Sequence, residues 1–228
     1  HCAAYTAVDK AEDEPEICRC VNAESVKAIA EACAKIGAKL VYISTDYVFP
    51  GTGDAFYEVQ DETAPCNVYG ASKLAGEQAV RESLDRYFIV RISWVFGING
   101  KNFIRTMLSL AKTHDSLTVV DDQIGSPTYT ADLAELIADM VGTEAYGTYH
   151  ATNEGICSWY ELACEVFRRR GLGVKVSPVP SSAYPTKAVR PHNSRLSKAS
   201  LDKAGFKHLP PWQDAVGRYL DELSVKGE

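Results

Sequence analysis

The sequence predicts an α/β fold of the Rossmann type, a doubly wound parallel sheet with a small C-terminal substrate lobe. Short apolar runs of strand length alternate with longer segments of helical character. Such alternation is typical of a parallel sheet with helices on both faces. The composition agrees, because 46% of the 228 residues are hydrophobic and 24% are charged, which suits a chain with a substantial core.

Apolar periodicity identifies the first helix. Within residues 22–36, apolar side chains recur at three- and four-residue steps and form one face of a helix: Val26, Ile29, Ala30, Cys33 and Ile36. The other helices are predicted at 67–84, 102–113, 130–141, 158–170, 198–204 and 212–223, and the strands at 39–44, 87–93, 117–120, 147–151 and 174–180. Thr130 is a predicted N-cap, and Ser158 with Glu161 has the spacing of a capping box.

Two units are expected along the chain. Residues 1–155 should form the remaining part of a Rossmann-type dinucleotide-binding domain whose first strands and glycine-rich loop are expected to be absent. Residues 117–130 should contribute to the substrate side. Residues 156–228 should form mainly the substrate-binding lobe and the C-terminal helices. The ligand should lie beyond the carboxyl ends of the strands, as in other doubly wound sheets.

Charge and composition exclude several classes of function. The formal net charge of −6 argues against a general affinity for nucleic acid. No apolar stretch reaches the length of a membrane span, and the first residues are polar, so we expect no membrane association and a cytoplasmic location. The seven cysteines are scattered without the paired spacing of a zinc site, and most should be free thiols.

Tyr69 and Lys73 form a Tyr-x-x-x-Lys spacing at the start of the predicted helix 67–84. This spacing puts both side chains on one helix face. A free phenol is a poor acid near neutral pH, and a neighbouring ammonium would lower its pKa. The pair then becomes a proton donor for a carbonyl oxygen. The spacing alone also fits a tyrosine packed on the sheet beside a surface lysine.

Thr45 follows the predicted strand 39–44, at the edge of the sheet where ligands are expected. Its hydroxyl should reach the same carbonyl oxygen that Tyr69 protonates. Trp94 and Thr152 follow later strands and mark the same edge. A helix-capping role is the alternative for Thr45.

The motifs in order are CAAYTAVDKAE (2–12), STDYVF (44–49), NVYGASKLAGE (67–77), RISWVFG (91–97), VDDQIGSPT (120–128) and RPHNS (190–194). They run through essentially the whole chain. In this order they resemble the extended short-chain dehydrogenase/reductase family and, within it, the dTDP-4-dehydrorhamnose reductases. The resemblance implies reduction of the 4-keto group of dTDP-4-dehydro-6-deoxy-L-mannose to dTDP-L-rhamnose, with NADPH or NADH as cofactor.

The resemblance also assigns roles around the reacting carbonyl. Tyr69 would protonate the sugar O4, while Lys73 would hold the nicotinamide ribose and tune Tyr69. Thr45 would hydrogen-bond the reacting oxygen. Residues expected to line the cofactor, besides Tyr69 and Lys73, are Ala4, Tyr5 and Thr6.

The expected contacts to the dTDP-sugar substrate extend from the carbonyl to the diphosphate. Besides Thr45 they include Asp46 and Trp94, which resembles the sugar-stacking residue of the family, with a core tryptophan as the alternative. Arg190 is a candidate for the diphosphate because its planar fork suits phosphate oxygens. An ordinary surface arginine is the alternative. Asn102 lies at a predicted helix start, where free amides bind anions.

The family begins with a strand, a glycine-rich phosphate loop and a helix. The sequence has no counterpart of this motif, and we expect the chain to lack that N-terminal segment and its strands. The residue that reads the ribose 2′ position belongs to the same segment, so the sequence favours neither coenzyme. The sequence contains no predicted metal site. The resemblance alone decides neither a dependence on Mg²⁺ nor the formation of a homodimer.

Three other readings stay open. Sugar-nucleotide 4,6-dehydratases resemble this chain but carry a glutamate where Tyr47 stands, and elimination of water needs that acid. Epimerases of the same family also use a tyrosine and a lysine with a bound nicotinamide. A non-catalytic NADP-binding subunit, similar to the regulatory subunit of methionine adenosyltransferase, is the reading from a different class.

Overall fold

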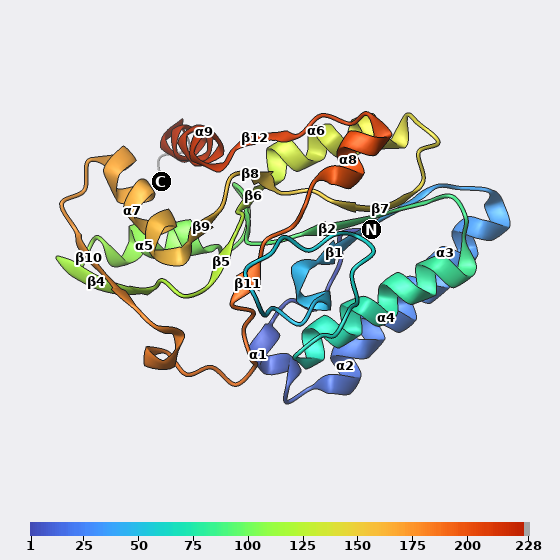
Figure 1. The fold of residues 1–228 in the computed structure, drawn as a ribbon, viewed down its shortest axis with the longest axis horizontal. Coiled ribbons are helices and arrows are strands. Elements are labelled where there is room, and N and C mark those ends of the chain that lie inside the picture. The colour runs from blue at the N-terminus through green and yellow to red at the C-terminus, as the bar shows by residue number, and fades with distance from the viewer. Residues whose placement is uncertain (226–228) are drawn as a thin grey trace.

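The computed structural model describes residues 1–225, and its centre is a three-stranded parallel sheet. Its strands, in the order β1-β2-β7, are β1 (Leu40–Thr45), β2 (Tyr87–Ile92) and β7 (Gly147–His150). The helices are α1 (Val8–Ala11), α2 (Pro15–Arg19), α3 (Ser25–Ile36), α4 (Val68–Ser83), α5 (Phe103–Leu110), α6 (Thr130–Val141), α7 (Trp159–Arg170), α8 (Ala199–Ala204) and α9 (Trp212–Val225). Figure 1 shows the sheet between two layers of helices, so the predicted α/β class is confirmed.

Each face of the sheet carries its own apolar core. α3 and α4 cover one face, where Tyr42 of β1 and Val80 of α4 are fully buried. α6 and α8 cover the other face, where Val90 of β2 packs with Met140 and Leu201. Strands buried on both faces read as nearly continuous apolar runs, which is why β1 and β2 were recognisable in the sequence.

A second group of elements forms the lobe on the left of Figure 1. Its strands are short: β3 (Val95–Phe96), β4 (Ser116–Val120), β5 (Ile124–Gly125), β6 (Thr128–Tyr129), β8 (Asn153–Glu154), β9 (Cys157–Ser158), β10 (Lys175–Val179), β11 (Asn193–Ser194) and β12 (Leu209–Pro211). α5, α7 and α9 pack together around Met107, Val166 and Tyr219. This core includes α5, while α8 joins the core of the main sheet. The division at residue 155 stays a prediction.

Helix ends follow local chemistry. The predicted capping box is confirmed, since the Ser158 side chain accepts a hydrogen bond from the Glu161 amide and the Glu161 carboxylate accepts one from the Ser158 amide. The prediction of Thr130 as an N-cap is wrong by one residue. Tyr129 is the N-cap of α6, because it is still extended where β6 pairs with β3. α1 and α2 were not predicted, since four and five residues are too few for a periodic pattern.

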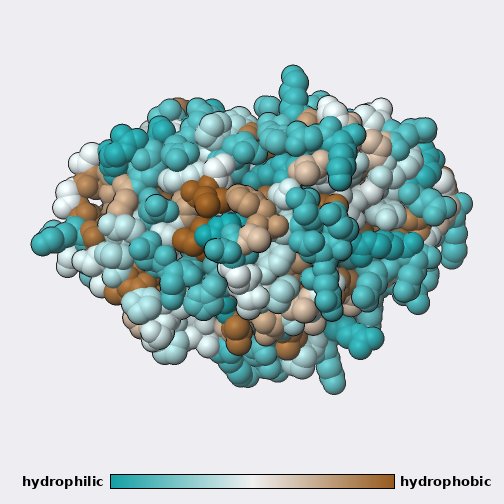
Figure 2. All heavy atoms as spheres, viewed as in Figure 1, coloured by the Kyte–Doolittle hydropathy of each residue, from teal (hydrophilic) through white to brown (hydrophobic). Residues whose placement is uncertain are grey.

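The surface is mostly hydrophilic on the face that Figure 2 shows, with apolar residues in small groups. All seven cysteines carry free thiols, as expected. Within residues 1–225, no helix has both the length and the apolar character needed to cross a membrane.

The packing of α8 on the sheet predicts the cost of truncating Leu201, which is fully buried. Leu201→Ala should lower the free energy of unfolding by about 2 to 5 kcal/mol, because it leaves a cavity under α8. Leu172→Ala is the matched control, because Leu172 is 39% exposed, and should cost about 1 kcal/mol or less. Urea denaturation measures both. Equal losses in the two variants would contradict the packing described here.

Candidate active site

The carboxyl end of β1 presents a buried hydroxyl and a buried carboxyl group. Thr45 is 6% exposed and Asp46 is 4% exposed. The Thr45 hydroxyl donates a hydrogen bond to Asp46 Oδ1 at 2.9 Å, and the Ser194 hydroxyl donates to Asp46 Oδ2 at 2.5 Å. The Thr45 side chain also accepts from the Tyr47 amide, which caps the short turn at Asp46–Val48. The alternative capping role of Thr45 is therefore present together with its place at the predicted site.

α4 reaches this strand end because two of its residues lack side chains. A Cβ atom at Gly70 would collide with the Tyr47 carbonyl oxygen, and one at Gly76 would collide with the Asn22 carbonyl oxygen and the Tyr42 hydroxyl. The Asn67 side chain caps the helix by accepting a hydrogen bond from the Gly70 amide. The first turn of α4 is therefore held directly beside Thr45.

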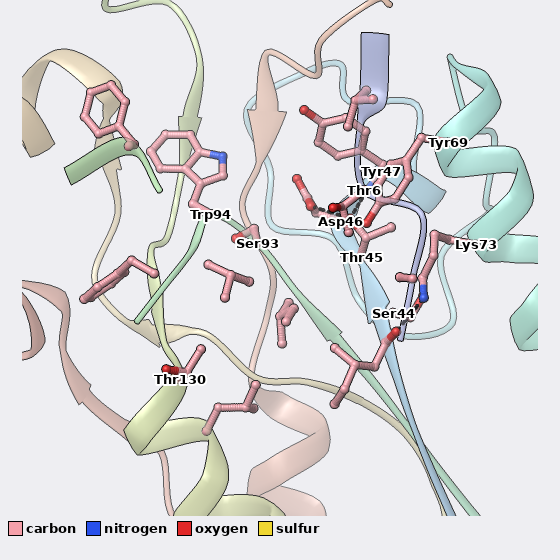
Figure 3. A pocket seen from close by; sticks show the side chains of 18 of the residues that line it. Thr6, Ser44, Thr45, Asp46, Tyr47, Tyr69, Lys73, Ser93, Trp94 and Thr130 are labelled. Atoms are coloured by element: carbon pink, nitrogen blue, oxygen red, sulfur yellow. Dashed lines mark hydrogen bonds between the residues drawn. The ribbon is translucent and has the colours of Figure 1, made fainter. Parts of the chain in front are cut away.

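Tyr69 and Lys73 lie on the face of α4 that meets the sheet. The Tyr69 ring makes an edge contact with Tyr47, with 5.5 Å between ring centroids. Lys73 is 2% exposed; its ammonium donates to the Ile43 carbonyl oxygen at 2.7 Å and lies 4.0 Å from the centroid of the Tyr42 ring. Figure 3 shows Tyr69 and Lys73 on the α4 side of a cavity, with Thr45 and Asp46 beside them and Trp94 across from them.

The pKa of Tyr69 differs from the expectation that Lys73 lowers it. Burial raises the pKa of Tyr69, the hydrogen bond with Thr45 opposes this, and Asp46 raises the pKa further. Burial also lowers the pKa of Lys73 to about 8, although Glu77 counteracts it. The expected lowering of the Tyr69 pKa by Lys73 does not occur in this arrangement, because the Lys73 ammonium is directed to the Ile43 carbonyl and the Tyr42 ring.

The cavity has a volume of about 550 Å³. Its lining includes seven of the ten residues that the sequence proposed for the site: Ala4, Thr6, Thr45, Asp46, Tyr69, Lys73 and Trp94. They come from the N-terminal segment, β1, α4 and the end of β2, which are separated by long stretches of sequence. The structure thus brings most of the proposed residues together, and their individual roles stay predictions.

Trp94 forms the wall opposite Tyr69. Its φ of 50° is unusual for a residue other than glycine and is typical of functional sites. Its indole stacks on Trp159 with 3.8 Å between ring centroids. Phe103 packs against Trp159, with 4.7 Å between their ring centroids. Trp94 is therefore one member of an aromatic cluster, and its predicted stacking on the sugar would use the surface that Trp159 leaves uncovered.

A second cavity of about 550 Å³ adjoins the first, because Tyr47, Phe103 and Trp159 line both. Arg190 lines the second cavity. Its guanidinium donates to the Asp9 carboxylate at 2.5 Å and to the Tyr47 hydroxyl at 3.3 Å. Arg190 is thus partly buried and paired, which differs from an ordinary surface arginine.

Two proposed residues lie outside the linings of both cavities. The Tyr5 hydroxyl donates to Glu14, and its amide donates to the Asn22 side chain. Asn102 caps α5, with its amide group donating to Gly97 and to the Tyr219 hydroxyl. The helix start that we proposed as an anion site is therefore capped by its own side chain. Ligand contacts of Tyr5 and Asn102 stay predictions.

Sequence reasoning missed Trp159 and Phe103. Trp159 was visible only as the first residue after the capping serine, and Phe103 as an apolar residue of a helix. Neither position carries a motif. Their function as a wall between two cavities depends on the packing of α7 against α5, which local sequence does not encode.

The residues at the floor of the first cavity fit the nicotinamide end of a dinucleotide. Cys2, Ala4 and Thr6 line the same cavity as Lys73 with small side chains, which leave room for a flat ring and a ribose. One of the three ammonium N–H groups of Lys73 is given to Ile43, so donors remain for ribose hydroxyls. Within the described residues, no group of three metal-binding side chains could hold an ion.

Comparisons with known proteins agree with this geometry. Residues 1–225 match the family described as the RmlD substrate binding domain. The dTDP-4-dehydrorhamnose reductase of Escherichia coli K12 is 46% identical over 232 residues, which cover 97% of this chain and 78% of that protein. The crystal structure of dTDP-4-dehydrorhamnose reductase from Bacillus anthracis in complex with NADP superposes with a TM-score of 0.95 at 46% identity, covering 97% of this chain and 79% of that one. The enzyme of Clostridium acetobutylicum gives 0.96 at 42% identity, covering 98% and 79%.

The burial of Asp46 predicts a pH-dependent contribution to stability. Burial raises the pKa of Asp46 from 3.8 to about 6, against the hydrogen bonds from Ser194 and Thr45. The folded state therefore binds this proton more tightly than the unfolded state, so the stabilisation is complete below pH ~4 and is lost as the pH rises through 6.

Relative to Asp46→Asn, the wild-type protein should lose about 2 to 3 kcal/mol of unfolding free energy between pH 4 and pH 7.5. Denaturant unfolding of both proteins at the two pH values measures this difference. A stability difference that does not change with pH would show that folding does not raise the pKa of Asp46.

Proposed function

We propose that this chain, which belongs to the dTDP-4-dehydrorhamnose reductase family, reduces the 4-keto group of dTDP-4-dehydro-6-deoxy-L-mannose to dTDP-L-rhamnose with NAD(P)H. It is an NAD(P)H-dependent oxidoreductase. The observation that carries the proposal is the meeting of Thr45, Tyr69 and Lys73 on one wall of a cavity, opposite Trp94.

Reduction of a ketone requires a hydride at the carbon and a proton at the oxygen. A bound nicotinamide supplies the hydride. Tyr69 donates its phenolic proton to the sugar O4. The Thr45 hydroxyl turns from Asp46 Oδ1 to donate a hydrogen bond to the same oxygen, so that the oxygen meets two O–H donors. The raised pKa of Tyr69 keeps the phenol protonated before the transfer.

Lys73 is placed to bind the ribose and to support Tyr69 after it has lost its proton. A tyrosinate that forms on donation is a new negative charge in a buried site, and the Lys73 ammonium stabilises it once it turns from the Ile43 carbonyl toward Tyr69. Because burial lowers the pKa of Lys73 to about 8, activity should decline in alkaline solution as Lys73 loses its charge.

The rest of the substrate would extend into the second cavity. Arg190 is its positive group, and the diphosphate would exchange with Asp9 as the partner of the guanidinium. Trp94 would bound the sugar, and Asp46 would contact it from the end of β1. In the proposed complex, the sugar of the dTDP-sugar lies in the first cavity and its charged diphosphate lies in the second.

The other readings have less support. Tyr47 stands at the position where dehydratases carry an acid, and burial raises the pKa of its phenol, which makes it a much weaker acid than a carboxyl group. A non-catalytic NADP-binding subunit would not need Thr45, Tyr69 and Lys73 together. It would bind NADPH without consuming it when a keto sugar is present. The homodimer and the cytoplasmic location stay predictions.

NADPH oxidation, followed by absorbance with dTDP-4-dehydro-6-deoxy-L-mannose, tests the proposed reaction. The full-length protein should consume the coenzyme only when the keto sugar is present, and the product should be dTDP-L-rhamnose. Binding of NADPH without turnover would instead support the regulatory-subunit reading.

Tyr69→Phe should lower kcat by about 10²-fold or more while the dissociation constant of NADPH changes little, because only the proton donor is removed. Stopped-flow kinetics and fluorescence titration measure the two quantities. Tyr146→Phe is the matched control, since Tyr146 lines neither cavity and its hydroxyl accepts a hydrogen bond from Arg86 at the amino-terminal ends of β2 and β7. Unchanged turnover in Tyr69→Phe would remove Tyr69 from the mechanism.

A further inference from the structure

Glu77 lies on α4 one turn beyond Lys73, and its carboxylate is fully buried against the sheet. Oε1 accepts hydrogen bonds from Ser44 Oγ at 2.6 Å and from Arg91 Nε at 2.9 Å. Oε2 accepts from Arg91 Nη2 and from Arg81 Nη2, both at 2.8 Å. A bidentate pair of this kind fixes the relative orientation of its two side chains as well as their distance.

Arg91 is as enclosed as its partner. It lies on β2 and is 2% exposed. Its Nη1 donates to the Val59 carbonyl oxygen at 3.2 Å, and its guanidinium lies 4.9 Å from the centroid of the Phe49 ring. His150 lies 3.5 Å from Nη1, and burial together with the Arg91 charge lowers the pKa of His150 to about 3. His150 is therefore neutral, and Glu77 is the carboxylate that compensates Arg91.

The buried ion pair of Glu77 and Arg91 is expected to contribute little net free energy to folding. Desolvation of two charges offsets most of their attraction, and apolar residues of similar volume often stabilise a core equally well. What the pair adds is a defined geometry between α4 and two strands. Glu77 joins the helix to Ser44 of β1 and to Arg91 of β2, and Lys73 joins it to the Ile43 carbonyl.

We propose that Glu77 is a positioning residue: held by Arg91 and Ser44, it fixes α4 on the sheet so that Tyr69 and Lys73 face the cavity beside Thr45. This inference rests on the reductase function proposed above. Glu77 is absent from the residues that line the cavity, so it acts through its neighbours on α4 and β1.

Glu77 also acts on Lys73 through its charge. The groups around the Lys73 ammonium are the Tyr42 ring, Glu77 and the thiols of Cys18 and Cys2. Burial lowers the pKa of Lys73, and Glu77 is the largest influence in the opposite direction. Without the Glu77 charge, the buried ammonium loses its proton at lower pH.

The test compares Glu77→Gln and Ser44→Ala with wild-type full-length protein over a range of pH. In Glu77→Gln, kcat should fall by about 10²-fold, because small displacements of reacting groups have effects of this size. The KM for NADPH should rise by a smaller factor than kcat falls, because Lys73 also holds the ribose, and the alkaline limb of the kcat profile should move to lower pH by about one unit. Ser44→Ala keeps the ion pair and should lower kcat by about tenfold.

Glu165→Gln is the matched control. Glu165 pairs with Arg168 and Arg169 on α7 and lines neither cavity, so its loss should leave kcat and the pH profile as in the wild type. A purely structural role for Glu77 predicts a lower melting temperature with an unchanged pH limb, and that result would overturn the proposal.

Carbon-13 NMR of ε-labelled lysine reads the Lys73 pKa without turnover, with Lys73→Met for assignment. The pKa should fall in Glu77→Gln and stay unchanged in Glu165→Gln. If the wild type does not reduce the keto sugar, the proposed function fails while this titration still decides the effect of Glu77 on Lys73. If Glu77→Gln does not fold, Ser44→Ala decides: wild-type kcat in that variant would refute the positioning role.

Discussion

The close approach of α4 to β1 is the contact on which the rest of the site depends. It requires the absence of a Cβ at Gly70 and Gly76, where backbone and side-chain atoms of neighbouring segments fill the space. Because the helix lies so near the strand, Tyr69 can share a hydrogen bond with Thr45 and Lys73 can reach the backbone of β1. A larger residue at either glycine would move both functional side chains away from the strand end.

The lobe supplies the opposite wall. Trp94 leaves β2 with a positive φ and stacks on Trp159 of α7, so the end of the central sheet and the lobe meet in one aromatic contact. On one side of this contact lies the cavity with Tyr69, and on the other lies the cavity with Arg190. In the proposed function the neutral sugar lies on the Tyr69 side of this contact, and the charged diphosphate lies on the Arg190 side, where it can bind the guanidinium.

The sequence predicted the strongly patterned parts of this arrangement. The apolar stripe of α3, the apolar runs of β1 and β2 and the capping box at Ser158 are local features, and the structure agrees with them. The order of the motifs along the chain was enough to predict that Thr45, Tyr69 and Lys73 lie at one edge of the sheet. Other features depend on contacts between segments that are distant in the sequence, so local patterns carried no signal for them. These features are the direction of the Lys73 ammonium, the wall formed by Trp159 and the hydrogen bonds that hold Glu77.

Transfer of deuterium from labelled NADPH tests the central claim most directly. The full-length protein is incubated with dTDP-4-dehydro-6-deoxy-L-mannose and coenzyme deuterated at C4 of the nicotinamide on the transferring face, and the product is analysed by proton NMR. The product should be dTDP-L-rhamnose with deuterium at C4 of the sugar, in an amount equal to the coenzyme oxidised. Coenzyme that stays reduced, or deuterium that appears at another carbon, would contradict it.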